Sequence, residues 1–287
     1  MSAHPDLAAR YETDGFAFPI RVLPTDVAHA HAEHVIALET AAEANRRYLR
    51  SNSHVVYRFV DELSRLPAIL DAVEPILGPD LLLWSASFFS KPPRASGYVS
   101  WHQDLNYWGL DGTEEVTAWL ALTDVNDENG FMRFVPGSQR LGVVRHDDTF
   151  ADDNLLSRGQ ELAVDVDERD AVSACLAAGE ISLHHGRLFH ASNANRTDGW
   201  RVGLALRYIN PDTRQVVGQR DFAQLVRGED RCGHFESLPR PSADPDPEGI
   251  RRFEEIQAVS DSYLYEGATR AGRQQPDAQS APRDGGA

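Results

Sequence analysis

A histidine and an aspartate two residues apart form the first pattern that points to chemistry. His102 and Asp104 stand in the segment YVSWHQDLNYW. Alternate side chains of a strand share one face, so on a strand both would reach a single metal ion, and the flanking aromatic residues would keep that face dry. The His-x-Asp pattern also occurs at His4 and His146. The first of these lies in a terminal segment and the other in a polar loop, so context favours His102 and Asp104.

A third metal ligand has to come from elsewhere, and the segment AGEISLHHGRLFHASNANRTDGWRVGLALRYI contains three histidines, His184, His185 and His190. The pattern predicts a strand, a tight turn at Gly186 and Arg187, a second strand with His190, a polar turn and a third strand. Neutral imidazole is the commonest protein ligand for metals. By residue type alone, each of the three histidines is a candidate.

The third strand of this segment has two different faces. One face carries Arg201, Gly203, Ala205 and Arg207, and the other carries Val202, Leu204, Leu206 and Tyr208. A face of arginine and small residues leaves space beside a cation. It suits a bound carboxylate, because a guanidinium holds a carboxylate through two parallel hydrogen bonds.

Composition limits the class of protein and its partners. The chain has 287 residues, of which 41% are hydrophobic, and its formal net charge is −16. A chain of this length buries enough surface to fold without a metal or disulfide, so a metal site would serve chemistry. The net negative charge disfavours nucleic acid and anionic membranes as partners. With 2 cysteines and no apolar targeting segment, we expect a cytoplasmic monomer or homodimer that acts on a small molecule.

The elements change character near residue 80. Before it, the sequence predicts helices around one short strand, FAFPIRVL, with Thr25 and Asp26 as a helix cap and a helical stretch DELSRLPAILDAVEPILG that stops at Gly78. From LLLWSASFF onward, short apolar or alternating runs are separated by turn residues. Such a pattern is typical of an antiparallel β sandwich or barrel.

Two further segments bear on domain organisation. The polar stretch 141–170 is too long for a hairpin turn, and we expect it to be a lid on the binding site. The stretch 268–287 is rich in Gly, Pro, Arg and Gln, and we expect a disordered tail. The expected organisation is therefore one domain over residues 1–267.

Three motifs in order resemble one known family: WHQD, then AWLALTDVNDENGFMRFVPGSQR, then HASNANRTDGWR. Together they resemble the phytanoyl-CoA dioxygenase (PhyH) family of iron(II)- and 2-oxoglutarate-dependent oxygenases, from ARYETDGF to about Ile209. The resemblance implies an all-β core with flanking helices, a double-stranded β-helix (cupin-like jelly roll). One departure is Gln139, which stands where relatives commonly have histidine after PGS and is not a ligand.

The resemblance also implies roles for individual residues. His102, Asp104 and His190 resemble the iron ligands, and Arg201 with Ser192 resembles the pair that binds the far carboxylate of 2-oxoglutarate. Trp119 matches a tryptophan that contacts this co-substrate. A two-histidine, one-carboxylate set leaves three iron positions for 2-oxoglutarate and O2. Residues that we expect near the substrate are Tyr57, Arg58, Asn106, Tyr107, Trp108 and Arg207.

The implied reaction is hydroxylation of an unactivated carbon in a small polar metabolite or natural-product intermediate, with release of succinate and CO2. Family members that chlorinate have Ala or Gly at the place of Asp104, so its carboxylate favours hydroxylation. Desaturation, epimerisation or ring closure on the same scaffold is an alternative outcome. A metal-binding, cupin-like sensor without oxygenase activity is the alternative from another class. Arg201 argues against it, because a pure metal binder needs no guanidinium eleven residues after His190.

Overall fold

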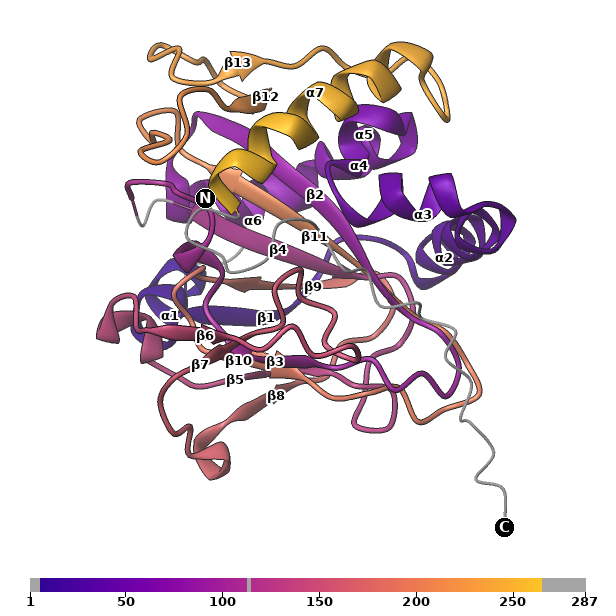
Figure 1. Ribbon diagram of the computed structural model, residues 1–287, viewed down its shortest axis with the longest axis vertical. Helices are drawn as coiled ribbons and strands as arrows, with labels where there is room; N and C mark the ends of the chain where they lie inside the picture. Colours follow the sequence, from indigo (N-terminus) through magenta and orange to yellow (C-terminus); the bar gives the residue numbers. More distant parts are fainter. Residues whose placement is uncertain (1–5, 113–114, 265–287) are drawn as a thin grey trace.

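Two antiparallel sheets face each other in the computed structural model, which describes residues 6–112 and 115–264 (Figure 1). In spatial order the seven-stranded sheet contains β1 (Phe16–Arg21), β9 (Glu180–His184), β4 (Glu115–Ala121), β11 (Arg201–Ile209), β2 (Leu81–Lys91), β12 (Phe222–Arg227) and β13 (Glu236–Ser237). The four-stranded sheet contains β3 (Val99–His102), β10 (His190–Ser192), β5 (Met132–Phe134) and β8 (Val172–Ala174). Within these sheets only the β12–β13 pair is parallel among the described strands. The expected double-stranded β-helix is confirmed.

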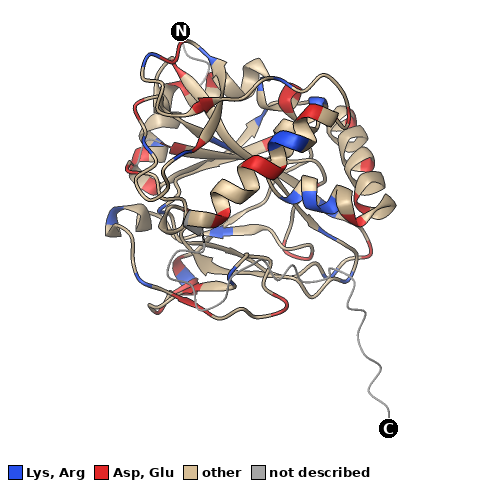
Figure 2. Cartoon of the chain, turned by 45° about the horizontal axis from the view of Figure 1, so that its top comes forward, with Lys and Arg blue, Asp and Glu red and all other residues tan. Residues whose placement is uncertain are grey.

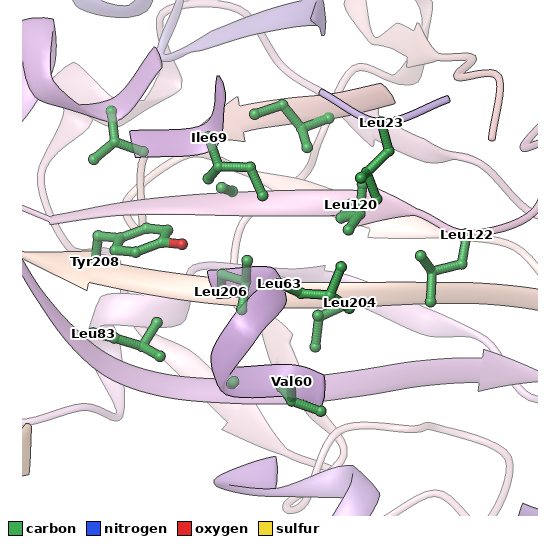
Figure 3. Close-up of a cluster of buried hydrophobic side chains, with 14 of the residues drawn as sticks. Leu23, Val60, Leu63, Ile69, Leu83, Leu120, Leu122, Leu204, Leu206 and Tyr208 are labelled. Atoms are coloured by element: carbon green, nitrogen blue, oxygen red, sulfur yellow. The ribbon is translucent and has the colours of Figure 1, made fainter. Parts of the chain in front are cut away.

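The helices cover the outer face of the large sheet, and the small sheet covers its inner face. The helices are α1 (Leu7–Asp14), α2 (Thr25–Ala41), α3 (Glu43–Arg50), α4 (Ser53–Val56), α5 (Arg58–Ser64), α6 (Pro67–Leu77) and α7 (Pro247–Leu264). On the helix side, Val60, Leu63 and Ile69 pack against Leu204 and Leu206 of β11 (Figure 3). Each buried leucine of this kind stabilises the fold by roughly 1.5–3 kcal/mol.

Strand β11 has the two faces that its alternation predicts. Val202, Leu204, Leu206 and Tyr208 belong to the cluster under the helices, whereas Ala205 belongs to a second cluster between the sheets. Every residue of β11 is buried, because one face meets the helices and the other meets the small sheet. The face with Arg201 and Arg207 is therefore directed into the interior of the barrel.

The N-terminal elements differ from expectation in two details. Helix α1 ends before Gly15, whose φ of 84° suits a glycine, and β1 follows as predicted. Thr25 and Asp26 do not cap α2: Pro24 occupies the cap position, and the Thr25 hydroxyl donates to the Ala178 carbonyl. The predicted stretch to Gly78 is two helices, α5 and α6. Pro67 separates them because the residue before a proline is driven out of the helical region, and Leu66 has a ψ of 125°.

The segment 141–170 carries structure of its own. It contains the β6 (His146–Asp148) and β7 (Gln160–Leu162) pair and the short 3₁₀ helix η3 (Glu168–Asp170), and η2 (Ser138–Leu141) leads into it. It is held on β3, since Asn154 Nδ2 donates to Ser100 Oγ (2.8 Å) and Ser100 Oγ donates to the Gln160 carbonyl (2.5 Å). That it acts as a lid stays a prediction. The predicted tail, 268–287, lies outside the described residues.

Surface charge and hydropathy bear on the expected partners. Acidic and basic residues are interspersed along α7, where Arg251 and Arg252 lie beside Glu248 (Figure 2). Among the described residues, no helix combines the length and the apolar character needed to cross a membrane.

Candidate metal and co-substrate site

His102, Asp104 and His190 meet between the sheets. Strand β10 pairs with β3 so that His190 lies opposite His102, and the two ring centroids are 4.0 Å apart. His102 Nε2 lies 3.3 Å from Asp104 Oδ1. One ligand atom from each residue lies within 4.8 Å of the other two, and this is the one such cluster of potential metal ligands found over residues 6–112 and 115–264. The three side chains converge closely enough to share an ion.

Asp104 reaches this cluster from a turn. The expectation that His102 and Asp104 share a strand is wrong, because β3 ends at His102 and Asp104 begins the 3₁₀ helix η1 (Asp104–Asn106). Gln103 between them is extended and fully buried, and its side chain donates to the carbonyls of Gly142 and Arg187, both at 2.7 Å. The two residues still face one point, because Gln103 anchors the corner at which the chain leaves the sheet.

Backbone carbonyls orient both imidazole rings. His102 Nδ1 lies 2.9 Å from the Ser100 carbonyl, and His190 Nδ1 lies 2.9 Å from the Leu188 carbonyl. A carbonyl oxygen only accepts hydrogen bonds, so each Nδ1 carries the proton and each Nε2 presents a lone pair. Histidine ligands of metals are held in this way, with the outer nitrogen donating to a carbonyl or carboxylate.

The protonation states also suit a cation. Burial alone would raise the pKa of Asp104, but the contact with His102 and the nearby His190 and Arg207 together hold that pKa well below its usual value. Burial, followed by the neighbouring His102, lowers the pKa of His190 well below 6.5. The site therefore presents an ionised carboxylate and a neutral imidazole, which are the forms that bind metals.

The other two histidines of the same segment are placed differently. His184, at the end of β9, lines a small cavity that the three candidate ligands also line, and its ring centroid is 5.0 Å from that of His190. It is not part of the three-residue cluster. His185 points away: its Nδ1 accepts from the Arg187 backbone and lies 3.5 Å from Glu115 Oε1. The geometry thus favours His190 over its neighbours as the third ligand.

Arg201 lies beside the cluster, at the start of β11. A cavity of about 40 Å³ is lined by all three candidate ligands together with Arg201, Ser192 and Trp119. Arg201 is 2% exposed, and its guanidinium donates to the carbonyls of Phe89 and Gly130, both at 3.1 Å. Its Nε has no hydrogen-bond partner among the described residues. Burial lowers its pKa to about 9. A buried cation with only neutral acceptors is costly, and an anionic ligand in the cavity would offset that cost.

Trp119 fills the space over Gly203. The sequence suggested that Gly203 and Ala205 leave room for a ligand, but a Cβ at position 203 would overlap the indole ring of Trp119, which lies across the sheet on β4. The Arg201 Cζ atom is 5.3 Å from the centroid of the same indole. Gly203 is therefore required for the packing of Trp119, and the indole in turn forms one wall of the 40 Å³ cavity.

A Gly203→Ala substitution is expected to destabilise the protein and weaken 2-oxoglutarate binding. The added methyl displaces the Trp119 ring, and overpacking of this kind costs roughly 1–3 kcal/mol. Denaturant titration measures the first effect and anaerobic 2-oxoglutarate titration the second. Gly199→Ala is the matched control, since a Cβ there meets no atom within 4 Å. Equal stability of the two variants would contradict the packing role of Gly203.

The residues expected at the substrate divide into two groups. Tyr107, Trp108 and Arg207 line a second cavity of about 190 Å³, whereas the exposed Asn106 does not. Tyr57 is fully buried in the core under the helices. Arg58 is half exposed, with its Nε 3.5 Å from Glu62 Oε1. Tyr57 precedes α5 and Arg58 is its first residue, and neither side chain lines the cavity.

Sequence reasoning missed much of this larger cavity. It is also lined by Arg50, Trp84, Ser87, Phe89, Arg158 and Asp221. Ser87 and Phe89 of β2 lie opposite Ala205 and Gly203 of β11, so they share the inner face of the sheet. The alternation of β11 revealed that face, but nothing local identifies β2 as its neighbour. The two cavities share Phe89, Asp104 and Arg207, so the larger one opens directly beside the candidate metal site.

Comparisons with known proteins show the family to which this chain is similar. The family model for phytanoyl-CoA dioxygenase (PhyH) matches residues 11–203. A "probable alpha-ketoglutarate-dependent hypophosphite dioxygenase" of Stutzerimonas stutzeri is 27% identical over 74% of this chain and 76% of that protein. The human peroxisomal phytanoyl-CoA dioxygenase is 24% identical over 53% of this chain and 46% of its own length.

Solved structures extend the match to most of the chain. The non-heme monooxygenase ThoJ, in its apo form, has a TM-score of 0.81 and 36% identity, and the match covers 91% of this chain and 98% of ThoJ. The epimerase SnoN, in complex with Fe3+, alpha ketoglutarate and nogalamycin RO, has a TM-score of 0.62 and 25% identity over 74% of this chain and 86% of SnoN. With the family model spanning more than half of its residues, the chain belongs to the phytanoyl-CoA dioxygenase (PhyH) family, and the resemblance in its motifs is confirmed.

Proposed function

We propose that this iron- and 2-oxoglutarate-dependent oxygenase hydroxylates an unactivated carbon of a small molecule, with release of succinate and CO2. The observation that carries the proposal is the pair of adjoining cavities that share Asp104: the smaller holds a buried guanidinium suited to 2-oxoglutarate, and the larger is free for a substrate. ThoJ, 36% identical to this chain, is named a non-heme monooxygenase, which supports insertion of one oxygen atom.

His102, Asp104 and His190 would hold the iron, and Arg201 with Ser192 would hold the far carboxylate of 2-oxoglutarate. Two imidazoles and one carboxylate would leave coordination positions on the iron for the keto acid and O2. When bound, the iron and 2-oxoglutarate supply the oxidising chemistry. The protein contributes orientation: carbonyl groups fix both imidazole rings, Gln103 fixes the turn to Asp104, and the buried guanidinium directs the co-substrate.

The larger cavity supports a small substrate with both apolar and polar groups. Its volume, about 190 Å³, is below the roughly 300–1,000 Å³ of pockets that enclose drug-sized ligands. Trp84 and Trp108 pack at 5.0 Å between ring centroids along one wall, and Arg158, paired with Asp148, stacks over Tyr107. A small metabolite, or one end of a larger natural product, fits such a space.

A screen for succinate release tests the proposal. The protein is incubated with iron(II), ascorbate and 2-oxoglutarate and with amino acids, quaternary amines, phosphonates or natural-product scaffolds. We expect one class to raise succinate release above the level without substrate, and mass spectrometry to show a product that has gained one oxygen atom. A product that lacks two hydrogens, or an isomer, would instead establish desaturation, ring closure or epimerisation, the last being the activity for which SnoN is named. Binding of a metal without any affinity for 2-oxoglutarate would favour the metal-binding sensor without oxygenase activity.

Added halide is expected to leave the product unchanged. As an iron ligand, Asp104 would take the coordination position that a halide needs, so reactions in excess chloride or bromide should give only oxygenated product. Mass spectrometry distinguishes the two outcomes through the isotope pattern of a halogenated product. Reactions in sulfate at equal ionic strength serve as the control. Halogen in the product of the unaltered protein would refute the assignment of Asp104 as a ligand.

A further inference from the structure

Lys91 is a fully buried cation beside the co-substrate cavity. It ends β2 and pairs across the sheet with Arg201 of β11, so both side chains extend from the same face. Its Nζ atom donates to Ser192 Oγ at 2.7 Å and to the carbonyl of Asn193. Neither Lys91 nor Arg201 forms an ion pair with a carboxylate in the described part of the chain.

Two buried cations with neutral partners are unfavourable in the free protein. Burial, followed by the nearby Arg201 guanidinium, lowers the pKa of Lys91 well below 10.5. Replacing either cation by an apolar residue of similar size would remove that cost. An arrangement that keeps both indicates that an anion enters the site, since a carboxylate next to them offsets the desolvation of each.

The contact with Ser192 also sets the direction of a hydrogen bond. An ammonium group only donates hydrogen bonds, so Ser192 Oγ accepts from Lys91. The Ser192 hydroxyl proton is then left to donate elsewhere, and Ser192 lines the 40 Å³ cavity together with Arg201. Lys91 itself does not line the cavity and lies behind the serine. The lysine therefore turns Ser192 into a donor aimed at an acceptor in the cavity.

We propose that Lys91 is a positioning residue for the far carboxylate of 2-oxoglutarate: it orients the Ser192 hydroxyl as a donor and, with Arg201, supplies the positive charge that selects a dicarboxylate co-substrate. The inference rests on the proposed function, in which Arg201 and Ser192 hold that carboxylate. It adds a residue from a strand that none of the three family motifs contains.

Lys91→Met tests the role through binding. Iron(II)-loaded protein is titrated without O2, by calorimetry and by the charge-transfer absorption, with 2-oxoglutarate and with 2-oxovalerate, which has the same carbon chain but no far carboxylate. We expect 2-oxoglutarate to bind roughly tenfold more weakly to the variant, the effect of one charge-assisted contact. Affinity for 2-oxovalerate should be unchanged or higher. Arg94→Met is the matched control, because this nearby cation is exposed and paired with Asp198.

An equal loss of affinity for both keto acids would mean that Lys91 only supports the fold, and unchanged 2-oxoglutarate affinity would also overturn the proposal. If Lys91→Met does not fold, Lys91→Gln keeps a donor for Ser192 Oγ without the charge and is expected to lose selectivity in the same direction. A structure of the unaltered protein with 2-oxoglutarate gives a separate check: a carboxylate bound away from Ser192 Oγ rules the role out. Arg201→Ala distinguishes failure of this inference from failure of the proposed function. If Arg201→Ala weakens 2-oxoglutarate binding and Lys91→Met does not, only the role of Lys91 is ruled out.

Discussion

His190→Ala protein is expected to bind no stoichiometric iron(II) and to release no succinate. The candidate site offers three ligand atoms within 4.8 Å of one another, so the variant retains only an imidazole and a carboxylate. Loss of an outer-shell partner of a metal ligand already costs ten- to a hundredfold in metal affinity, and loss of the ligand itself should cost more than about a hundredfold. The fold should persist, because the large core under the helices does not include His190.

His184→Ala is the matched control for that substitution. Its ring is also buried and lies 5.0 Å from His190 between centroids, so it removes an imidazole from the same cavity without removing a ligand. Anaerobic iron titration followed by elemental analysis should find metal retained in this variant and lost in His190→Ala. The reverse result would transfer the third ligand to His184. Circular dichroism and a thermal melt verify that both variants are folded.

Local patterns predicted the parts of the site that lie on one strand. The alternation along Arg201–Tyr208 assigned each side chain to the correct face, because a strand buried on both sides still alternates and its polar members mark the inner face. The tight turn at Gly186 and Arg187 also placed His190 at the start of a new strand. That strand belongs to the other sheet, which no local signal revealed.

The remaining parts depend on contacts between distant segments. Lys91 and Arg201 are 110 positions apart in the sequence, and only the pairing of β2 with β11 makes them neighbours. The corner at Gln103 depends on carbonyls of Gly142 and Arg187, which come from an insert and from a turn. A period of two therefore predicted a strand up to Asp104, whereas the tertiary hydrogen bonds of Gln103 end it at His102.

Arg201→Ala should weaken 2-oxoglutarate binding by roughly ten- to a hundredfold while iron binding stays nearly intact. A two-point contact between a guanidinium and a carboxylate contributes about 1.5–3 kcal/mol, and about 1.4 kcal/mol corresponds to tenfold. Arg201 is 2% exposed and its Nε has no hydrogen-bond partner within residues 6–112 and 115–264, so the guanidinium has hydrogen-bonding capacity left for a ligand in the cavity that it lines. The candidate iron ligands lie on other elements, η1, β3 and β10, and none of them is hydrogen-bonded to Arg201.

Anaerobic titration of iron-loaded protein with 2-oxoglutarate measures this loss through the charge-transfer absorption. Arg201→Lys should recover only part of the affinity, because an ammonium offers a point charge in place of a planar fork. The lysine variant also leaves Phe89 and Gly130 with fewer donors for their carbonyls, so its stability is measured alongside. Unchanged affinity in Arg201→Ala would remove this residue from the co-substrate site, and the charge of Lys91 behind Ser192 would then have no carboxylate to select.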